Sequence, residues 1–292
     1  MEEKRFAVLI DADNVSSKYI KYILDETANY GIATYKRIYG DWTKPNTAAW
    51  KDVLLENSVT PVQQYGYTIG KNATDSAMII DAMDILYSNN VDGFCIVSSD
   101  SDFTKLSSRL RESGMTVIGM GEKKTPKPFI ASCNQFKYLD VLAASEEKSM
   151  GLSDKLDTSK NESKNSSVSK IANGNDDIEK NMTNLQVIKA AVKKMLNEVD
   201  GNNQSMNMGE IGNRLAKRYP DFDVRNYGDT KLSKFLKKME FIQIENDKSG
   251  GTAMWVSLKD EDKSDEAEEK PPVSKSKRHY KKRKIKTDWL SR

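Results

Sequence analysis

The sequence is poor in the residues that commonly carry out acid–base and thiol chemistry, with one histidine and two cysteines among 292 residues. The histidine, His279, lies in a highly charged C-terminal stretch. Ser-His-Asp and Cys-His catalysis by a folded domain are therefore excluded, because both need a histidine base. Cys95 and Cys133 belong to no CxxC pair, which argues against a structural zinc site and a disulfide framework. Any hydrolysis must depend on carboxylates and a metal ion.

Long hydrophobic runs are also missing. No apolar segment is long enough to cross a bilayer, and the first residues, Met-Glu-Glu-Lys-Arg, do not resemble a secretory signal. We therefore expect a cytoplasmic protein without membrane contact. Charged residues make up 30% and hydrophobic residues 37%, which is polar for one compact body and is typical of ordered domains separated by solvated segments.

The composition along the chain predicts two domains. Residues 1–143 and 183–258 contain periodic hydrophobic patterns, whereas residues 144–182 contain hardly any large apolar side chain and predict a disordered linker. Residues 259–292 predict a disordered tail that is first acidic and then basic. The basic part of this tail would add affinity for a polyanion that salt weakens, or would simply be solvated.

The first domain shows apolar runs that alternate with helical patterns. Strands are predicted at 6–11, 32–39, 59–65, 92–97 and 115–119, with helices between them and a last helix and strand within 128–142. This alternation predicts an α/β fold with a parallel sheet covered by helices on both faces. In such a sheet the ligand site lies at the carboxyl ends of the strands.

The second domain shows three helical patterns followed by two short strand patterns. The helices are predicted at 183–199, 208–218 and 230–238, and the strands at 240–246 and 252–258. Three helices followed by a hairpin is the element order of a winged helix, a small α+β domain.

Aspartates follow two predicted strands and open one predicted helix at the same edge of the sheet. Asp11 and Asp13 follow the first strand, Asp75 opens a helix next to the N-cap candidate Thr74, and Asp100 and Asp102 follow the fourth strand. A single Asp at a strand end is usually a turn or cap residue. Converging carboxylates would repel by about 4 kcal/mol per close pair, which a divalent cation relieves. Oxygen-only ligation favours Mg²⁺ or Mn²⁺.

Three motifs in this region resemble the NYN family of PIN-like nucleases, of the limkain type. They are VLIDADN at 8–14, GKNATD at 70–75 and SSDSDF at 98–103, and the likeness covers about residues 5–143. The resemblance implies a PIN-like fold and hydrolysis of RNA around one or two metal ions. The implied catalytic residues and metal ligands are Asp11, Asp75, Asp100 and Asp102. The implied supporting residues are Asn14, Ser98 and Asp81. Ser99 departs from the family, which usually has Gly there.

The second predicted domain resembles the OST-HTH/LOTUS family over about residues 183–258. The likeness rests on Pro220-x-Phe222, Tyr227-Gly228 and the start of the helix at Lys231. Such domains are associated with RNA or with protein partners of RNA machinery, and pairing with an NYN domain is a known arrangement. The resemblance therefore implies RNA as the ligand, single-stranded or structured, and leaves protein partners and a homodimer open.

Several cations are candidate RNA contacts. Lys71 precedes Asp75 by about one helical turn and would reach a phosphate, although a loop lysine is usually solvated. The last predicted helix of the second domain would carry a phosphate-binding stripe, or merely an exposed basic face. The stripe residues are Arg225, Lys231, Lys234, Lys237 and Lys238.

Two other functions compete with a metal-dependent ribonuclease. One is a non-catalytic RNA-binding or scaffold protein, against which the presence of all four aspartates argues. The other is a phosphatase of the haloacid dehalogenase kind, because Asp11-Ala12-Asp13 resembles its nucleophile motif. Val15 stands near the place where that family has Thr, and the second domain would be unexplained. The choice of RNA, the endo- or exonucleolytic mode and the choice between Mg²⁺ and Mn²⁺ are left open by the sequence.

Overall fold

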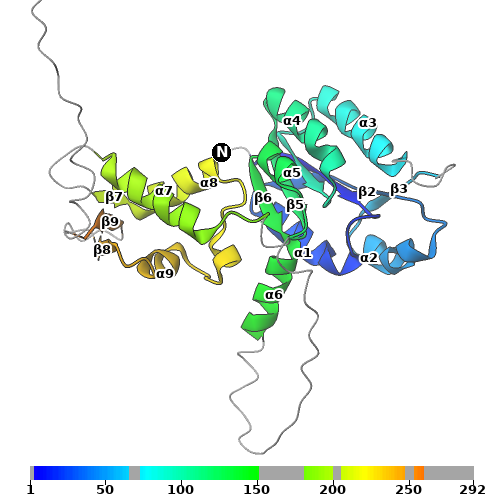
Figure 1. Ribbon diagram of the computed structural model, residues 1–292. Coiled ribbons are helices and arrows are strands. Elements are labelled where there is room, and N and C mark those ends of the chain that lie inside the picture. The colour runs from blue at the N-terminus through cyan, green and yellow to red at the C-terminus, as the bar shows by residue number, and fades with distance from the viewer. Residues whose placement is uncertain (1–2, 66–72, 151–180, 200–204, 247–252, 260–292) are drawn as a thin grey trace, which may run out of the picture.

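The computed structural model describes residues 3–65, 73–150, 181–199, 205–246 and 253–259. Two sheets organise these residues (Figure 1). The first has six parallel strands in the order β3-β2-β1-β4-β5-β6, and the second has three antiparallel strands in the order β7-β9-β8. The predicted fold class, a PIN-like α/β domain followed by a small winged-helix α+β domain, is confirmed.

The first domain alternates strands and helices as the sequence predicts. Its strands are β1 (Arg5–Asp11), β2 (Ile32–Gly40), β3 (Thr60–Gln63), β4 (Gly93–Val97), β5 (Thr116–Gly121) and β6 (Gln135–Tyr138). Its helices are α1 (Ile20–Ala28), α2 (Lys51–Glu56), α3 (Ala73–Tyr87), α4 (Thr104–Glu112), α5 (Lys127–Ser132) and α6 (Leu139–Met150). Short 3₁₀ turns precede three of them, η1 (Ser17–Tyr19), η2 (Pro45–Trp50) and η3 (Ser101–Phe103).

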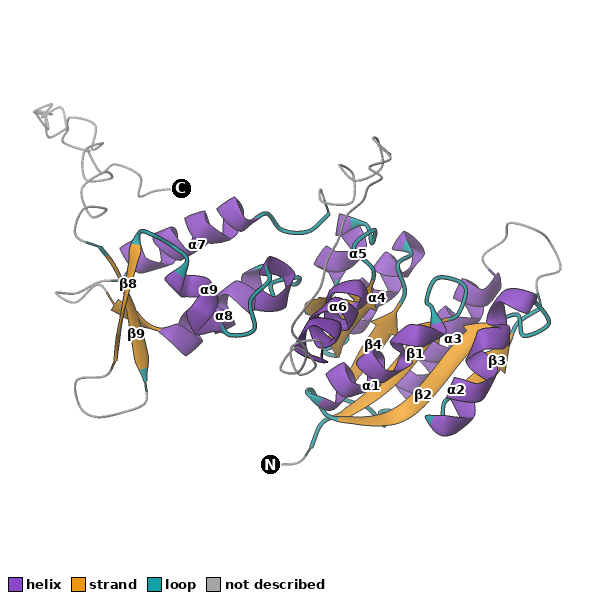
Figure 2. Ribbon diagram, turned by 90° about the horizontal axis from the view of Figure 1, so that it is seen from below, coloured by secondary structure: helices purple, strands orange, loops and turns teal. Residues whose placement is uncertain are grey.

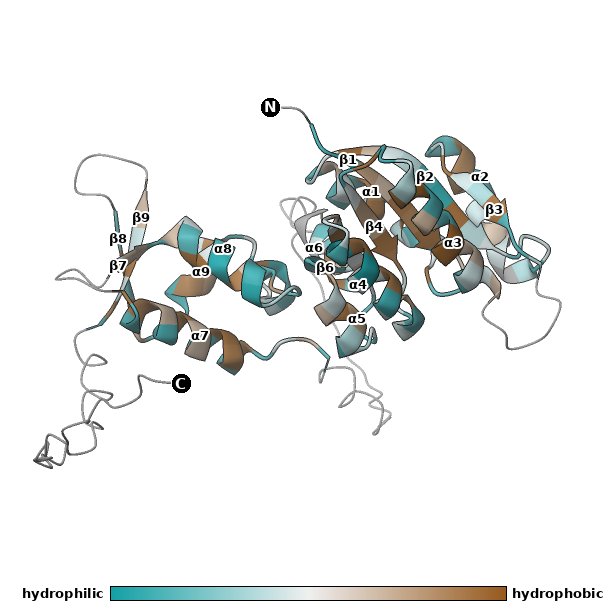
Figure 3. Ribbon diagram, turned by 90° about the horizontal axis from the view of Figure 1, so that it is seen from above, coloured by the Kyte–Doolittle hydropathy of each residue, from teal (hydrophilic) through white to brown (hydrophobic). Residues whose placement is uncertain are grey.

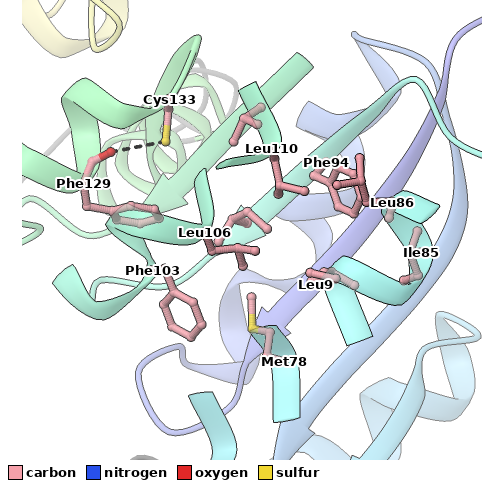
Figure 4. Close-up of a cluster of buried hydrophobic side chains, with 14 of the residues drawn as sticks. Leu9, Met78, Ile85, Leu86, Phe94, Phe103, Leu106, Leu110, Phe129 and Cys133 are labelled. Carbon is pink, nitrogen blue, oxygen red and sulfur yellow. Dashed lines mark hydrogen bonds between the residues drawn. The ribbon is translucent and has the colours of Figure 1, made fainter. Parts of the chain in front are cut away.

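The sheet is buried on both faces because helices cover each of them. Along β1, Ala7 and Leu9 enter a core with α3, α4 and α5, whereas Phe6, Val8 and Ile10 enter a second core with α1, α2 and α6. Figure 4 shows the first core, in which side chains of α3 and α4 surround Leu9. In Figure 3 the central strands are accordingly among the most hydrophobic segments. Strands buried on both faces need continuous apolar runs, which explains why β1 and β4 were recognisable in the sequence.

The second domain packs three helices against a small sheet. Its elements are α7 (Leu185–Asn197), β7 (Ser205–Asn207), α8 (Met208–Arg218), η5 (Val224–Tyr227), α9 (Leu232–Lys237), β8 (Ile242–Asn246) and β9 (Met254–Leu258). Asn184 and Asn207 cap α7 and α8 by accepting hydrogen bonds from backbone N–H groups two residues ahead. Strand β7 was not predicted, because three residues are too few to show a period.

The second domain lies beside β6, at one edge of the first sheet (Figures 1 and 2). The backbone N–H of Phe136 in β6 donates to the carbonyl of Pro220 at 2.8 Å, so the second domain satisfies part of this strand edge. The Tyr138 hydroxyl donates to Asp221 at 3.3 Å, and Asp221 also accepts from the backbone N–H and the hydroxyl of Thr183. The two domains therefore share a polar, largely buried interface.

Four charged side chains form the centre of this interface. Lys137 of β6 contacts Asp223 at 2.7 Å and Glu26 of α1 at 3.4 Å, and Arg225 contacts the same two acids at 2.7 and 3.1 Å. Both cations hold the pKa of the Asp223 carboxyl below its usual range, despite the opposing effect of burial. Each charge has a partner of opposite sign, which burial requires.

The predicted boundary at residue 143 is too early, because α6 continues to Met150. Ala and Glu, which favour helices, fill this extension, and Glu146 forms an ion pair with Lys21 of α1 at 3.5 Å. At the other end of the predicted linker, Met182 packs against the core of the first domain. The predictions of disorder for the rest of the linker and for 260–292 lie outside the described residues.

In the part of the chain that the structure describes, no helix is long and apolar enough to cross a membrane.

Candidate metal centre

The ends of β1 and β4 lie side by side and create the floor of the candidate site. Ile10 pairs with Val97, so Asp11 and Ser98 are the next residues on adjacent strands. The Ser98 hydroxyl donates to the Asp11 carboxylate at 2.7 Å, and the backbone N–H of Asp100 donates to the Ser98 oxygen at 3.0 Å. Ser98 therefore connects the two strand ends and positions the loop that carries Asp100.

Three aspartates converge above this floor. Oxygen atoms of Asp75, Asp100 and Asp102 all lie within 4.8 Å of one another. Asp75 comes from the first turn of α3, while Asp100 caps η3 by accepting from the backbone N–H of Asp102 at 2.9 Å. Burial, followed by the charges of Asp11, Asp100 and Asp102, raises the pKa of Asp75 to about 6.

Asp11 is fully buried and is not one of these three converging residues. Its carboxylate accepts three hydrogen bonds, from the Ser98 hydroxyl, from the Asn14 amide at 2.8 Å and from the backbone N–H of Asp13 at 3.0 Å. Burial raises the pKa of Asp11, and these donors partly offset the effect. Asp11 still contributes negative charge to the site, because after burial its charge has the largest effect in raising the pKa of Asp75.

Two contacts connect the surrounding loops. The Thr74 hydroxyl donates to Asp13 at 3.0 Å, which fastens the start of α3 to the loop after β1. Helix α3 begins at Ala73, so Thr74 lies inside the helix and the N-cap prediction for it is wrong.

Ser99, the departure from the family pattern, accepts from the backbone N–H of Glu122 at 2.9 Å and thereby connects the loop after β4 to the end of β5.

Gly121 is a residue near the site that sequence reasoning missed. A Cβ atom there would lie 2.5 Å from the carbonyl oxygen of Ser98 and 2.6 Å from the Thr125 hydroxyl. The close approach of β5 to the loop after β4 therefore requires glycine. The signal in the sequence is the position of Gly121 at the end of the apolar run that forms β5.

Asp81, one of the implied supporting residues, does not belong to the converging carboxylates. It accepts hydrogen bonds from Arg37 and from the Tyr39 hydroxyl, both on β2. Burial and Asp81 together raise the pKa of Tyr39 far above its usual value. Asp81 therefore connects α3 to the sheet and supports the fold under the site.

The candidate RNA contacts divide into four groups. Lys71 lies outside the described residues. Lys231, Lys234 and Lys237 are exposed on or next to α9, whereas Lys238 contacts Asp229 at 2.7 Å. Arg225 does not belong to the predicted stripe, because its guanidinium is held by Asp223 and Glu26 between the domains. We therefore omit Arg225 from the RNA surface. The sequence could not reveal its partner Glu26, which is 199 residues away.

The atoms that could ligate a metal at the site suit a hard divalent cation. All three converging groups are carboxylates, and among the described residues no histidine or cysteine joins them. Mg²⁺ and Mn²⁺ prefer such oxygen ligands. Burial and the neighbouring carboxylates raise the pKa of Asp75, and a bound cation would oppose both effects by favouring its charged form. Asp75, Asp100 and Asp102 are therefore the residues that would hold the ion.

Replacing Asp75 by Asn should make the metal-free protein more stable at about pH 7.5, because one of the mutually repelling charges is removed. The folded-state pKa of Asp75 exceeds the unfolded value of about 4, so the wild-type carboxyl becomes protonated in the folded state as pH falls through about 6. The difference in melting temperature between the two proteins should therefore shrink at about pH 5. Thermal melts in EDTA measure both differences.

Manganese ions should reverse this order of stability. They should raise the melting temperature of the wild type, because a ligand that binds only the folded state stabilises it, and should affect Asp75→Asn much less. The control is Asp84→Asn, an exposed acid on the same helix. Equal stabilisation of all three proteins by Mn²⁺ would show that the ion binds elsewhere.

Two known domain families agree with this architecture. The NYN domain family matches residues 5–140, and the OST-HTH/LOTUS domain family matches residues 183–253. No curated protein matches the chain. A solved structure of a protein of unknown function from Vibrio parahaemolyticus is similar, with 18% identity and a TM-score of 0.39 over 47% of this chain and 96% of that chain. The chain is thus an NYN-domain protein that also carries an OST-HTH/LOTUS domain.

Proposed function

We propose that this protein is a metal-dependent ribonuclease that hydrolyses RNA phosphodiester bonds at the aspartate cluster, with its OST-HTH/LOTUS domain binding the RNA. The observation that carries the proposal is the convergence of Asp75, Asp100 and Asp102 within 4.8 Å at the carboxyl ends of the strands. This is the place where parallel sheets bind ligands. The match to the NYN family, whose members are generally nucleases, supports the same reaction.

The aspartates have two different parts in the proposed reaction. Asp75, Asp100 and Asp102 would hold a divalent ion, while Asp11 positions Ser98 and Asn14 and adds negative charge to the site. When bound, Mg²⁺ or Mn²⁺ supplies Lewis acidity toward the phosphate and lowers the pKa of water. The carboxylate oxygens orient the attacking water by accepting its hydrogen bonds. No histidine base is required, which agrees with the position of His279 far from the domain cores in sequence.

The exposed lysines of the second domain supply the proposed RNA surface. Lys231, Lys234 and Lys237 lie on or next to α9, and their ammonium groups suit phosphate oxygens. Such contacts position a strand and do not read its sequence. Binding of protein partners by this domain and formation of a homodimer stay predictions.

The test is cleavage of end-labelled single-stranded RNA by the purified full chain. We expect cleavage with Mg²⁺ or Mn²⁺ and none in EDTA, since the ion is needed to compensate the clustered charge. Fragment lengths on a sequencing gel would distinguish internal cuts from cuts at an end. RNA binding without cleavage in either metal would instead support the RNA-binding scaffold.

A further inference from the structure

A cleft of about 730 Å³ lies between the two domains, away from the aspartate cluster. The first domain contributes the end of α4 and the connection from α5 to β6, and the second contributes the last turns of α8. We call it the junction cleft. Among the described residues, its lining includes three cations, Arg111, Lys217 and Arg218, and three amides, Asn134, Gln135 and Asn213, and no carboxylate.

The three cations of the junction cleft come from both domains. Arg111 is held at the wall, because its guanidinium donates to the carbonyl oxygens of Ala131 and Ser132 at 3.2 and 3.1 Å. Lys217 and Arg218 occupy the last turn of α8, where cations also interact favourably with the helix dipole. The dipole explains their place on α8 but does not explain why Arg111 of the other domain lines the same cleft. Cations and amide groups without acids suit phosphate oxygens.

Helix α4 connects the junction cleft to the aspartate cluster. It begins directly after η3, which contains Asp102, and ends one residue after Arg111. Nine residues make this helix about 14 Å long. Lys105 and Arg109 are exposed and lie on one face of it at i, i+4 spacing. Helix α4 therefore spans the distance from the aspartates to the cleft, which a short stretch of nucleic acid strand can cover, and its exposed face offers Lys105 and Arg109 to phosphates.

We propose that the junction cleft binds the phosphate backbone of the nucleic acid strand whose scissile bond lies at the aspartate cluster. This inference rests on the proposed function, which supplies the identity of the bound strand. Each domain contributes part of the cleft. The strand is therefore bound only while the ion pairs of Lys137 and Arg225 hold the two domains together.

The experiment compares Lys217→Glu with Lys51→Glu, which makes the same charge change at an exposed residue of α2. Binding of fluorescein-labelled RNA of about 12 nucleotides to the full chain is measured by fluorescence anisotropy in EDTA, where the RNA stays intact. We expect Lys217→Glu to weaken binding about 10-fold and to reduce the slope of log K against log salt by about 1, because one phosphate contact is lost. Arg218→Glu should act in the same way. Lys51→Glu should bind nearly as the wild type does.

Phosphate contacts carry no sequence information, so the loss should be equal for oligo-U, oligo-A and the corresponding DNA strands. The inference would be overturned if Lys217→Glu, Arg218→Glu and Lys51→Glu bound RNA with equal affinity. It would also be overturned if the loss of affinity were confined to one base sequence. Cleavage is scored separately with metal. If the wild type binds RNA but never cuts it, while Lys217→Glu still binds RNA more weakly, the proposed nuclease activity is refuted and the proposal for the junction cleft is supported.

Discussion

Asp100→Asn is expected to reduce the rate of RNA cleavage by roughly 10²–10³-fold, the size of effect seen when one preorganised electrostatic group is removed from an active site. The carboxylate of Asp100 both caps η3 and faces Asp75 and Asp102. Asparagine caps as well as aspartate does, because its side-chain oxygen can still accept from the backbone N–H of Asp102. The substitution therefore removes charge from the cluster while preserving the local fold.

The measurement is the initial rate of cleavage of labelled RNA at saturating Mn²⁺, with Asp84→Asn as the control. Asp84 is exposed on α3 and its loss changes net charge by the same amount. A second readout, independent of activity, is the stabilisation by Mn²⁺ in a thermal melt, which Asp100→Asn should largely lose. Cleavage by Asp100→Asn at the wild-type rate would place the reaction elsewhere or reveal a contaminating nuclease.

Lys137→Met is expected to lower the free energy of unfolding by about 3 kcal/mol and to separate the unfolding of the two domains. Lys137 has 11% of its side chain exposed and lies between Glu26 and Asp223. Removing one member of a buried ion pair leaves a carboxylate without full compensation, which typically costs about 3–5 kcal/mol. Arg225 still contacts both acids, so we expect the lower end of this range.

Urea denaturation of the full chain checks this prediction. In the wild type the two domains should unfold together, because the first stabilises the second. Lys137→Met should show two transitions, and the second domain should unfold in the first of them. Lys51→Met, on exposed α2, controls for the loss of a lysine. Unchanged unfolding of Lys137→Met would mean that the ion pairs contribute no coupling between the domains.

Acid should weaken the same interface in the wild type. The pKa of Asp223 is lowered in the folded state, so its contribution to stability is present above the unfolded pKa of about 4 and is lost as pH falls below that value. Lys137→Met should lose less stability than the wild type over this range, because one of the two cations that lower this pKa is gone.

Local patterns in the sequence were enough to predict most of the fold. The apolar runs of β1 and β4 and the amphipathic helices were recognisable because hydrophobic periodicity depends on neighbouring residues alone. The positions of Asp75, Asp100 and Asp102 at one edge also followed from the sequence, since the carboxyl ends of parallel strands share an edge. Strand β7 and the extension of α6 escaped prediction, because one is too short for a pattern and the other is stabilised partly through α1.

The sequence by itself therefore determined the two domains, their element order and the gathering of aspartates. Only the tertiary structure decided which partner each polar side chain takes. It placed Asp11 under the cluster with Ser98 and Asn14, directed Asp81 to Arg37 and Tyr39, and joined Arg225 to Glu26 across 199 positions of sequence. The physical reason is that burial forces every charge to find a compensating partner, and that partner is the nearest group in space.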